Sequence, residues 1–272
     1  LLVIAWYGFT DRTGAFTLAN VRAIASPEHL KALGLSLSLS IACTILCLLI
    51  AYPLAMILKK TGMGKKGFVV FIFILPMWMN FLLRTYSWMS ILENNGLLNQ
   101  LFQQIGLIDL YNQIAMHFAS DPAAYVPIDH FQMIGTQGAV VLGMVYNYLP
   151  FMILPIYSVL VKLDHSLIEA ARDLGASSVQ VFRKVILPLS LPGVLSGITM
   201  VFVPSVSTFA ISRLLGGGTQ MMLGDLIEQQ FLGGAYNPHL GSAIALVMMI
   251  IVVVCMYVMN RFGDGEEQAV ML

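Results

Sequence analysis

The sequence predicts an all-α polytopic membrane protein, and three observations support this fold class. Of its 272 residues, 58% are hydrophobic and only 10% are charged, whereas about a quarter of the residues in a soluble domain are charged. Five apolar segments are long enough to cross a bilayer, and basic residues are concentrated in alternate connections between them. Lys+Arg and Asp+Glu both total 14, so the net charge does not indicate a nucleic-acid partner.

The apolar segments define the expected helices. A transmembrane helix needs about 20 apolar residues, and segments of this length must be helical because lipid offers the backbone no hydrogen-bond partners. Leu1–Phe9 is too short to span and is expected to be the end of a partly present first helix, which makes a six-helix bundle in one membrane domain, 1–272. The five full spans are expected at Ala32–Leu58, Gly67–Leu92, Gly138–Val161, Leu189–Ser212 and Leu240–Asn260.

Basic residues predict the orientation of these helices, because Lys and Arg favour cytoplasmic connections. The 93–137 connection has no Lys or Arg, and the connection after Ser212 begins with its only one, Arg213, so both are expected to be external. The alternation then places both chain termini in the cytoplasm. The cytoplasmic connections are expected at Lys59–Lys66, with four lysines, and at 162–190, with Lys162, Arg172, Arg183 and Lys184.

The 162–190 connection carries signals for two short helices. Ser166 followed by Glu169 fits a capping box, and Gly175 is suited to a left-handed helix stop. Ser177 with Gln180 fits a second capping box, after which the chain returns to the membrane. We expect two amphipathic helices around a glycine elbow, the first with an apolar face formed by Leu163, Leu167, Ala171 and Leu174.

A spaced motif runs through the same connection. It comprises Glu-Ala-Ala at 169–171, then Gly175, then Leu187-Pro188, with Val185 where Ile is usual. This pattern resembles the EAA motif of ABC importer permeases, in which the loop is a coupling helix that inserts into a groove of a cytoplasmic ATPase. An interfacial helix pair that only caps the bundle is the alternative. The resemblance implies that coupling depends on Glu169, Ala170, Ala171, Arg172, Asp173, Gly175, Leu187 and Pro188.

Longer segments are similar to the permeases of spermidine/putrescine importers: Pro76–Trp88, Asn95–Asn99, Leu149–Tyr157, and Leu163-Asp164 with Leu167–Ala176. The resemblance implies a non-catalytic permease subunit without its own cofactor, working by alternating access in a bacterial plasma membrane. It also implies two ATPase subunits that bind ATP and Mg, a second and distinct permease, and an extracytoplasmic substrate-binding protein. Permeases for thiamine, metal cations or oxyanions share much of the pattern, so these solutes are alternatives.

Aromatic, amide and hydroxyl side chains in the spans are candidates for the translocation path, because a polyamine needs acceptors and aromatic faces. No Asp or Glu lies within the five spans, and their one basic residue, Arg84, is expected to snorkel outward or to pair with a carboxylate. The same residue types also form interfacial belts and helix contacts. The candidates are Trp78, Asn80, Tyr86, Trp88, Tyr146, Asn147, Tyr148, Ser205, Ser207 and Thr208.

The predicted external connection 93–137 carries acidic residues without basic ones. The negative electrostatic potential of this connection would attract cations and basic surfaces. This suggests that a substrate-binding protein docks there. The simpler interpretation is the usual scarcity of basic residues on the external side. The acidic residues are Glu93, Asp109, Asp121 and Asp129.

Two other classes of function are disfavoured. An intramembrane enzyme needs titratable groups that converge at depth, but all five histidines lie outside the expected spans. A secondary transporter or channel usually relies on intramembrane carboxylates or inverted repeats, and the sequence shows neither. Cys43, Cys47 and Cys255 lie in apolar spans and are expected to be small buried side chains rather than metal ligands or a disulfide.

Overall fold

The computed structural model describes residues 1–61, 73, 75–118, 125–234 and 236–270, and for 259–260 and 262–270 the backbone alone. Within these ranges the chain is helical apart from its connections and one antiparallel bridge between Thr10 and Phe16. The helices are α1 Leu2–Gly8, α2 Ala19–Ala23, α3 Pro27–Thr61, α5 Phe81–Leu92, α6 Leu97–Gln104, α7 Leu107–Phe118, α8 Gln137–Lys162, α9 His165–Asp173, α10 Ser178–Val181, η2 Phe182–Ile186, α11 Leu187–Val206, α12 Ala210–Leu215, α13 Leu223–Leu232 and α14 Pro238–Val270.

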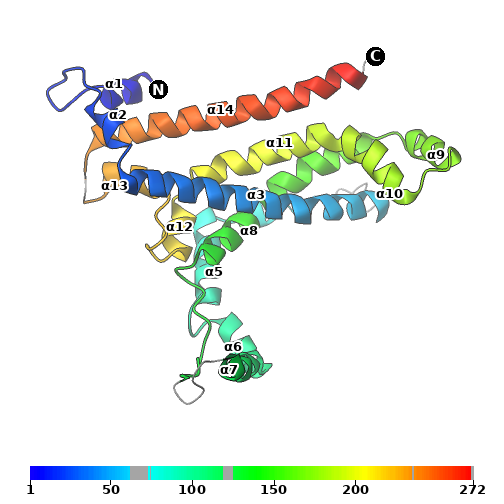
Figure 1. The fold of residues 1–272 in the computed structure, drawn as a ribbon, viewed down its shortest axis with the longest axis horizontal. Coiled ribbons are helices and arrows are strands. Elements are labelled where there is room, and N and C mark those ends of the chain that lie inside the picture. The colour runs from blue at the N-terminus through cyan, green and yellow to red at the C-terminus, as the bar shows by residue number, and fades with distance from the viewer. Residues whose placement is uncertain (62–72, 74, 119–124, 235, 271–272) are drawn as a thin grey trace.

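Four long helices form the bundle and lie side by side (Figure 1). In the part of the chain that the structure describes, four segments are long and apolar enough to span a membrane: Pro27–Thr61, Gln137–Lys162, Ser178–Val206 and Pro238–Val258. They correspond to four of the five expected spans. Helices α9 and α10 lie at one end of the bundle and α13 at the other (Figure 1), so the two connections that flank α11 are on opposite sides.

The fifth expected span, Gly67–Leu92, lies partly outside the described residues, which omit 62–72 and 74. Its described part contains a break, so the expectation of one continuous helix over this range is wrong. Residues 75–78 are helical, the helix stops at Met79, and α5 begins anew at Phe81. The Asn80 side chain causes the restart, because its Oδ1 accepts hydrogen bonds from the N–H groups of Leu82 at 2.9 Å and Leu83 at 3.4 Å. Asn is among the residues preferred at this capping position.

The expected span Leu189–Ser212 is wrong at both ends. The helix begins earlier, because α10, η2 and α11 form one continuous helix from Ser178 to Val206. Its π-helical turn ends at Ile186, two residues before Pro188. Pro188 has no N–H to donate to the carbonyl one turn back, and the locally wider turn accommodates this loss. At the other end the helix stops at Val206 and restarts at α12.

The break after Val206 coincides with a close approach of α13. A Cβ on Gly224 would lie 2.4 Å from the Thr208 carbonyl oxygen and 2.7 Å from that of Ser207. Only glycine permits this contact, so the start of α13 packs directly on the non-helical residues of the break.

Small side chains let α3 and α11 pack closely on α8. Association of helices in lipid depends on such close packing rather than on the hydrophobic effect. On α3, a stripe of fully buried small residues faces the bundle: Ser40, Cys43, Cys47, Ala51 and Ala55. Cys43 and Cys47 are thus buried as expected, whereas Cys255 is only half-buried.

Two glycines of α11, Gly193 and Gly197, form the corresponding contact with α8. A Cβ on Gly193 would lie 2.9 Å from the Pro155 carbonyl oxygen, and a Cβ on Gly197 would lie 2.7 Å from the Met152 sulfur. Their four-residue spacing is that of the small-xxx-small motif, which brings helix backbones together in membranes.

Gly193→Ala is expected to destabilise the protein by about 1–3 kcal/mol, the range for overpacking a filled core. The new methyl group would meet a backbone oxygen, so a change of rotamer cannot relieve the contact. Thermal unfolding of the purified protein in detergent measures the effect. Gly34→Ala on α3 is the matched control, since its Cβ meets nothing within 4 Å; equal melting temperatures for both variants would contradict the packing.

Candidate functional site

Helix α9 carries the Glu-Ala-Ala sequence, and it starts two residues earlier than its sequence suggests. Its N-cap is Asp164, whose Oδ1 accepts a hydrogen bond from the Ser166 N–H at 3.0 Å. The expected capping box from Ser166 to Glu169 is therefore wrong, because Asp164 already occupies the cap. The Ser166 N–H also holds the pKa of the Asp164 carboxyl below its usual value. Glu169 instead pairs with His165, one turn back, at 3.0 Å.

The glycine elbow is confirmed. Gly175 has a φ of +81°, in the left-handed region. The Gly175 N–H donates to the Arg172 carbonyl at 2.8 Å and the Ala176 N–H to the Ala171 carbonyl at 3.0 Å, which is the Schellman arrangement that ends a helix. The α9 helix thus ends at Asp173, two residues before Gly175, and the chain turns sharply at the glycine.

The second capping box is confirmed as well. The Ser177 N–H donates to Gln180 Oε1 at 2.8 Å, and the Gln180 N–H donates to Ser177 Oγ at 3.4 Å. The expected second short helix is not separate, however, because it continues into α11 without interruption. Leu187 and Pro188 lie at the junction, so the end of the motif is part of the transmembrane helix itself.

The loop presents apolar side chains to solvent in the isolated chain. Leu167, Leu174 and Val179 are 47%, 89% and 66% exposed, while Ile168 and Val181 are buried and anchor the loop. Exposed large apolar groups clustered beside charged ones indicate a binding surface. The remaining residues of the motif on α9, Glu169, Ala170, Arg172 and Asp173, are exposed and Ala171 is half-buried. We call the exposed residues from Leu167 to Val179 the loop surface.

Tyr52 of α3 connects this loop region to the bundle, and sequence reasoning missed it. Its hydroxyl is 2.7 Å from Ser190 Oγ on α11, and its ring meets Phe182 of η2 edge-on with centroids 5.7 Å apart. Both partners lie within or directly after the loop, so α3 contacts the segment that follows the elbow. A polar aromatic residue within a span is the only sequence signal for this role.

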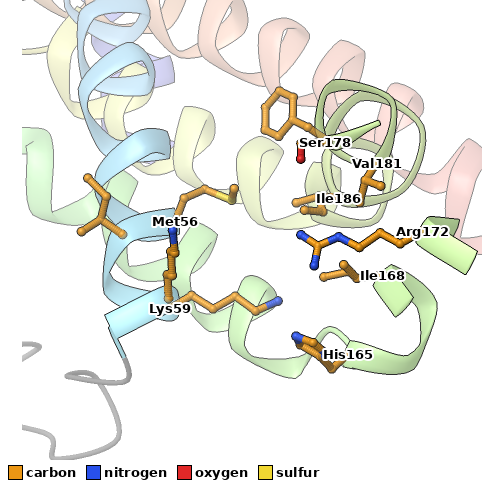
Figure 2. Close-up of a pocket in the computed structure, with 11 residues that line it drawn as sticks. Met56, Lys59, His165, Ile168, Arg172, Ser178, Val181 and Ile186 are labelled. Atoms are coloured by element: carbon orange, nitrogen blue, oxygen red, sulfur yellow. The ribbon is translucent and has the colours of Figure 1, made fainter. Parts of the chain in front are cut away.

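A cavity of about 600 Å³ lies between the end of α3, α9 and the start of the long helix (Figure 2). Its wall is apolar on α3 and the long helix, with Met56 and Phe182 among the lining residues. Its basic lining residues are Lys59, Lys60, His165 and Arg172. Arg172 points its guanidinium from α9 into this space (Figure 2).

The structure brings some candidate path residues together at the break after α11. Tyr148 of α8 is buried, and its hydroxyl donates to the Pro204 carbonyl at 3.3 Å. Ser205 and Ser207 donate back to carbonyls of their own helix, and Thr208 is buried beside the break. Asn147 is buried too; its amide donates to the Gly143 carbonyl at 2.8 Å, while its Oδ1 has no hydrogen-bond partner.

The remaining path candidates lie on a different face. Trp88 of α5 meets Tyr146 of α8 edge-on with ring centroids 5.3 Å apart. Trp78 and Tyr86 are exposed, and Asn80 is exposed as the cap of α5. The structure therefore divides the candidates into a buried set that stabilises the bundle and an exposed aromatic set around α5.

Arg84 behaves differently from either expectation. Its side chain is buried rather than extended outward, and within the described residues it forms no salt bridge with a carboxylate; instead Nη1 donates to the Pro76 carbonyl at 2.9 Å. Its guanidinium also lies over the Tyr146 ring, 5.8 Å from the centroid, a favourable cation–π position. The Pro76 carbonyl also accepts from the Met79 N–H at 3.3 Å, so the Arg84 hydrogen bond links α5 to the turn that precedes the helix break.

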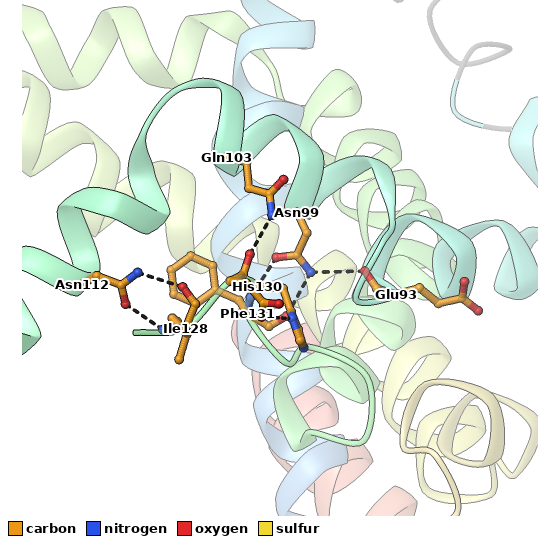
Figure 3. Close-up of polar contacts among 8 residues, drawn as sticks. Glu93, Asn99, Gln103, Asn112, Ile128, His130 and Phe131 are labelled. Atoms are coloured by element: carbon orange, nitrogen blue, oxygen red, sulfur yellow. Dashed lines mark hydrogen bonds and ion pairs between the residues drawn. The ribbon is translucent and has the colours of Figure 1, made fainter. Parts of the chain in front are cut away.

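The 93–137 connection is structured rather than a loop. It contains α6 and α7, and two asparagines hold its returning segment (Figure 3). Asn99 exchanges two hydrogen bonds with the Phe131 backbone, at 3.0 and 2.9 Å, and Asn112 exchanges two with Ile128, at 2.8 and 3.0 Å. Of the acidic residues, Asp129 pairs with His130, whereas Asp121 lies outside the described residues.

Contacts at the end opposite α9 were also missed by sequence reasoning. Ser36 Oγ of α3 accepts a hydrogen bond from the Leu223 N–H at 2.7 Å, and Arg213 pairs with Glu228 at 2.7 Å. Asp225 is only 6% exposed, and burial raises the pKa of its carboxyl although the Met222 N–H donates to it. These contacts tie α12 and α13 to α3.

Four helices that are long and apolar enough to span a membrane, with the short helix α9 at one end of the bundle, define the described part of the chain as a helical membrane protein. Residues 49–265 match the family described as binding-protein-dependent transport system inner membrane component. The chain belongs to this family of ABC importer permeases.

Relatives with stated functions support the same family. The spermidine/putrescine transport system permease protein PotB of Haemophilus influenzae is 35% identical over 267 residues, which cover 96% of this chain and 86% of that protein. PotB of Escherichia coli K12 is 35% identical over 236 residues, or 87% of this chain and 78% of that protein. The relatives are permease subunits.

The fold is also found in a solved structure. A chain in the crystal structure of a bacterial alginate ABC transporter, in complex with an alginate pentasaccharide-bound periplasmic protein, matches with a TM-score of 0.73 and 15% identity. The match covers 96% of this chain and 85% of that chain. At this identity the likeness shows the fold alone, and it confirms the predicted fold class.

Gly175→Ala is expected to weaken the elbow by about 1–2 kcal/mol, the cost of a left-handed conformation for an L-residue. A Cβ there would meet nothing within 4 Å, so the cost lies in the backbone alone. Hydrogen exchange of the amides of 165–176 should become faster. Gly175→Asn is the matched control, because Asn tolerates the left-handed conformation better than Ala does. Equal exchange rates in the two variants and the wild type would contradict the Schellman ending.

Proposed function

We propose that this chain is the translocating permease subunit of an ATP-driven importer for polyamines such as spermidine and putrescine. The observation that carries the proposal is its 35% identity to a spermidine/putrescine permease over 96% of the chain. The subunit itself has a non-catalytic role and uses no cofactor. The whole chain acts as one permease domain in a bacterial plasma membrane, with both termini in the cytoplasm.

The loop surface receives the driving motion in this proposal. Two partner ATPase subunits bind ATP with Mg and close on one another, and one of them engages α9 through its exposed apolar and charged residues. The geometry supports such coupling, because the elbow at Gly175 leads directly into the helix that continues to Val206. Tyr52 passes the same displacement to α3 through Phe182 and Ser190.

The translocation path lies between this subunit and a second, distinct permease. The exposed aromatic set around α5, with Trp78, Tyr86 and Tyr146, offers faces that attract organic cations. No Asp or Glu occurs between residues 32 and 61 or between 138 and 162 of the described spans, which fits a path with weak intrinsic affinity. Selection of the solute then falls to an extracytoplasmic binding protein that docks on the external face, including the α6–α7 region.

Glu169→Ala is expected to lower uptake roughly tenfold or more, since a loss of about 1.4 kcal/mol at the ATPase contact gives a factor of ten. Folding should be preserved, because an exposed pair such as Glu169 with His165 contributes about 0–1 kcal/mol. Uptake by proteoliposomes, with ATP hydrolysis measured in parallel, gives the result. Glu28→Ala, an exposed acid at the far end of α3, is the matched control; wild-type uptake by the Glu169 variant would refute the coupling role.

The solute is tested by the ATPase activity of the co-purified complex, reconstituted with its binding protein, with and without spermidine or putrescine. Stimulation by either polyamine is the expected result, because solute-loaded binding protein should promote closure of the ATPase pair. Thiamine, a divalent metal cation and an oxyanion serve as comparison solutes. Stimulation by one of these alone would keep the permease and exclude polyamines, whereas a chain that purifies without any ATPase would overturn the proposed coupling.

A further inference from the structure

The cavity between the end of α3 and α9 has an unbalanced charge. Lys59, Lys60 and Arg172 are basic side chains, and His165, which pairs with Glu169, adds a fourth basic group. Among the lining residues that the structure describes there is no Asp or Glu. Three like charges around one space repel each other unless an anion lies between them, so the cavity is electrostatically suited to an anionic group.

Apart from Ser178, the rest of the lining is apolar. Met56 and Ile57 of α3 face Ile168 of α9 and the Val181, Phe182 and Ile186 side chains of the long helix. A small inorganic anion gains nothing from such walls, whereas a molecule with both a charged head and a hydrocarbon part can satisfy both surfaces. The volume, about 600 Å³, is in the range of sites for small amphiphilic ligands.

The position of the cavity along the bundle identifies the source of such a molecule. Lys59 and Lys60 occupy the last turn of a membrane-spanning helix, the level at which long basic side chains reach lipid headgroups. Basic pockets between helices at this level bind anionic phospholipid heads. A lipid there enters laterally from the bilayer, with its acyl chains along the apolar wall.

We propose that this cavity binds the headgroup of one anionic phospholipid, held by Lys59, Lys60 and Arg172 above the apolar wall. The bound lipid bridges α3 and α9, because the two lysines and the arginine come from those two helices. The state of the loop surface then depends on the anionic lipid content of the membrane. This inference does not depend on the transported solute.

Native mass spectrometry of the full chain in detergent micelles tests the proposal by direct binding. The probes are dioleoylphosphatidylglycerol, which is anionic, and dioleoylphosphatidylcholine, which has the same acyl chains and no net charge. We expect one phosphatidylglycerol to bind at least tenfold more tightly than phosphatidylcholine. Lys59→Gln together with Arg172→Gln should weaken it roughly 30-fold, at about fivefold for each basic residue.

Two control variants keep the result interpretable. The Lys59→Arg and Arg172→Lys double variant retains both charges and should bind like the wild type, which separates lost charge from lost folding. Lys184→Gln removes an exposed lysine of η2 that does not line the cavity, so binding should change less than twofold.

Equal affinity for the two lipids, or an equal loss in the Lys184 variant, would overturn the proposal. Displacement of the lipid by millimolar inorganic phosphate would also overturn it, because the site would then take a free anion. ATP hydrolysis and uptake are not used as readouts, so failure of the lipid site and failure of the proposed transport function give different results.

Discussion

The demand that every backbone hydrogen-bonding group be satisfied without water governs this fold. It explains why the spanning segments are helices, and it also explains what happens where they are interrupted. At the break before α5, Asn80 caps the new helix and Arg84 takes up the Pro76 carbonyl. At the break after α11, the carbonyls of Ser207 and Thr208 lie against the start of α13, where glycine allows the approach. Each interruption is thus matched by a specific polar or small residue.

Close helix packing and loop geometry depend on residues that look unremarkable in a hydropathy profile. The small residues of α3 and the glycine pair of α11 set how near the helices come to α8. Tyr52 then contacts both Phe182 and Ser190 at the loop end. The loop and the bundle are therefore one continuous packed structure, so a displacement of the loop also displaces α3 and α11.

Much of this architecture could be predicted from the sequence, for identifiable reasons. Four spans were predicted correctly because length and hydropathy alone determine them. The elbow at Gly175 was predicted correctly because it depends only on a glycine that follows the end of a helix. The helix breaks were missed because Asn80 and Ser207 sit in runs that remain apolar on average. The N-cap of α9 was predicted at Ser166 instead of Asp164, because both residue types are suitable caps and the two lie only two residues apart. The roles of Arg84 and Tyr52 depend on partners 8 and 138 residues away, which no local pattern reveals. The functional roles assigned to the motif and path residues stay predictions.

The uninterrupted helix from Ser178 to Val206 has a mechanical consequence. Its 29 residues have a contour length of about 43 Å at about 1.5 Å per residue, and the π-helical turn, Phe182–Ile186, divides it into a short part at the loop and the longer α11. One tip is fixed to the glycine elbow, and the opposite tip ends where the start of α13 rests on Ser207 and Thr208. When α11, the 20 residues beyond that turn, tilts as a unit by about 5°, its far tip shifts by about 2.6 Å, since it is about 30 Å long. The contact of Gly224 with the break is therefore the point along α11 where a given tilt at the loop end produces the largest displacement.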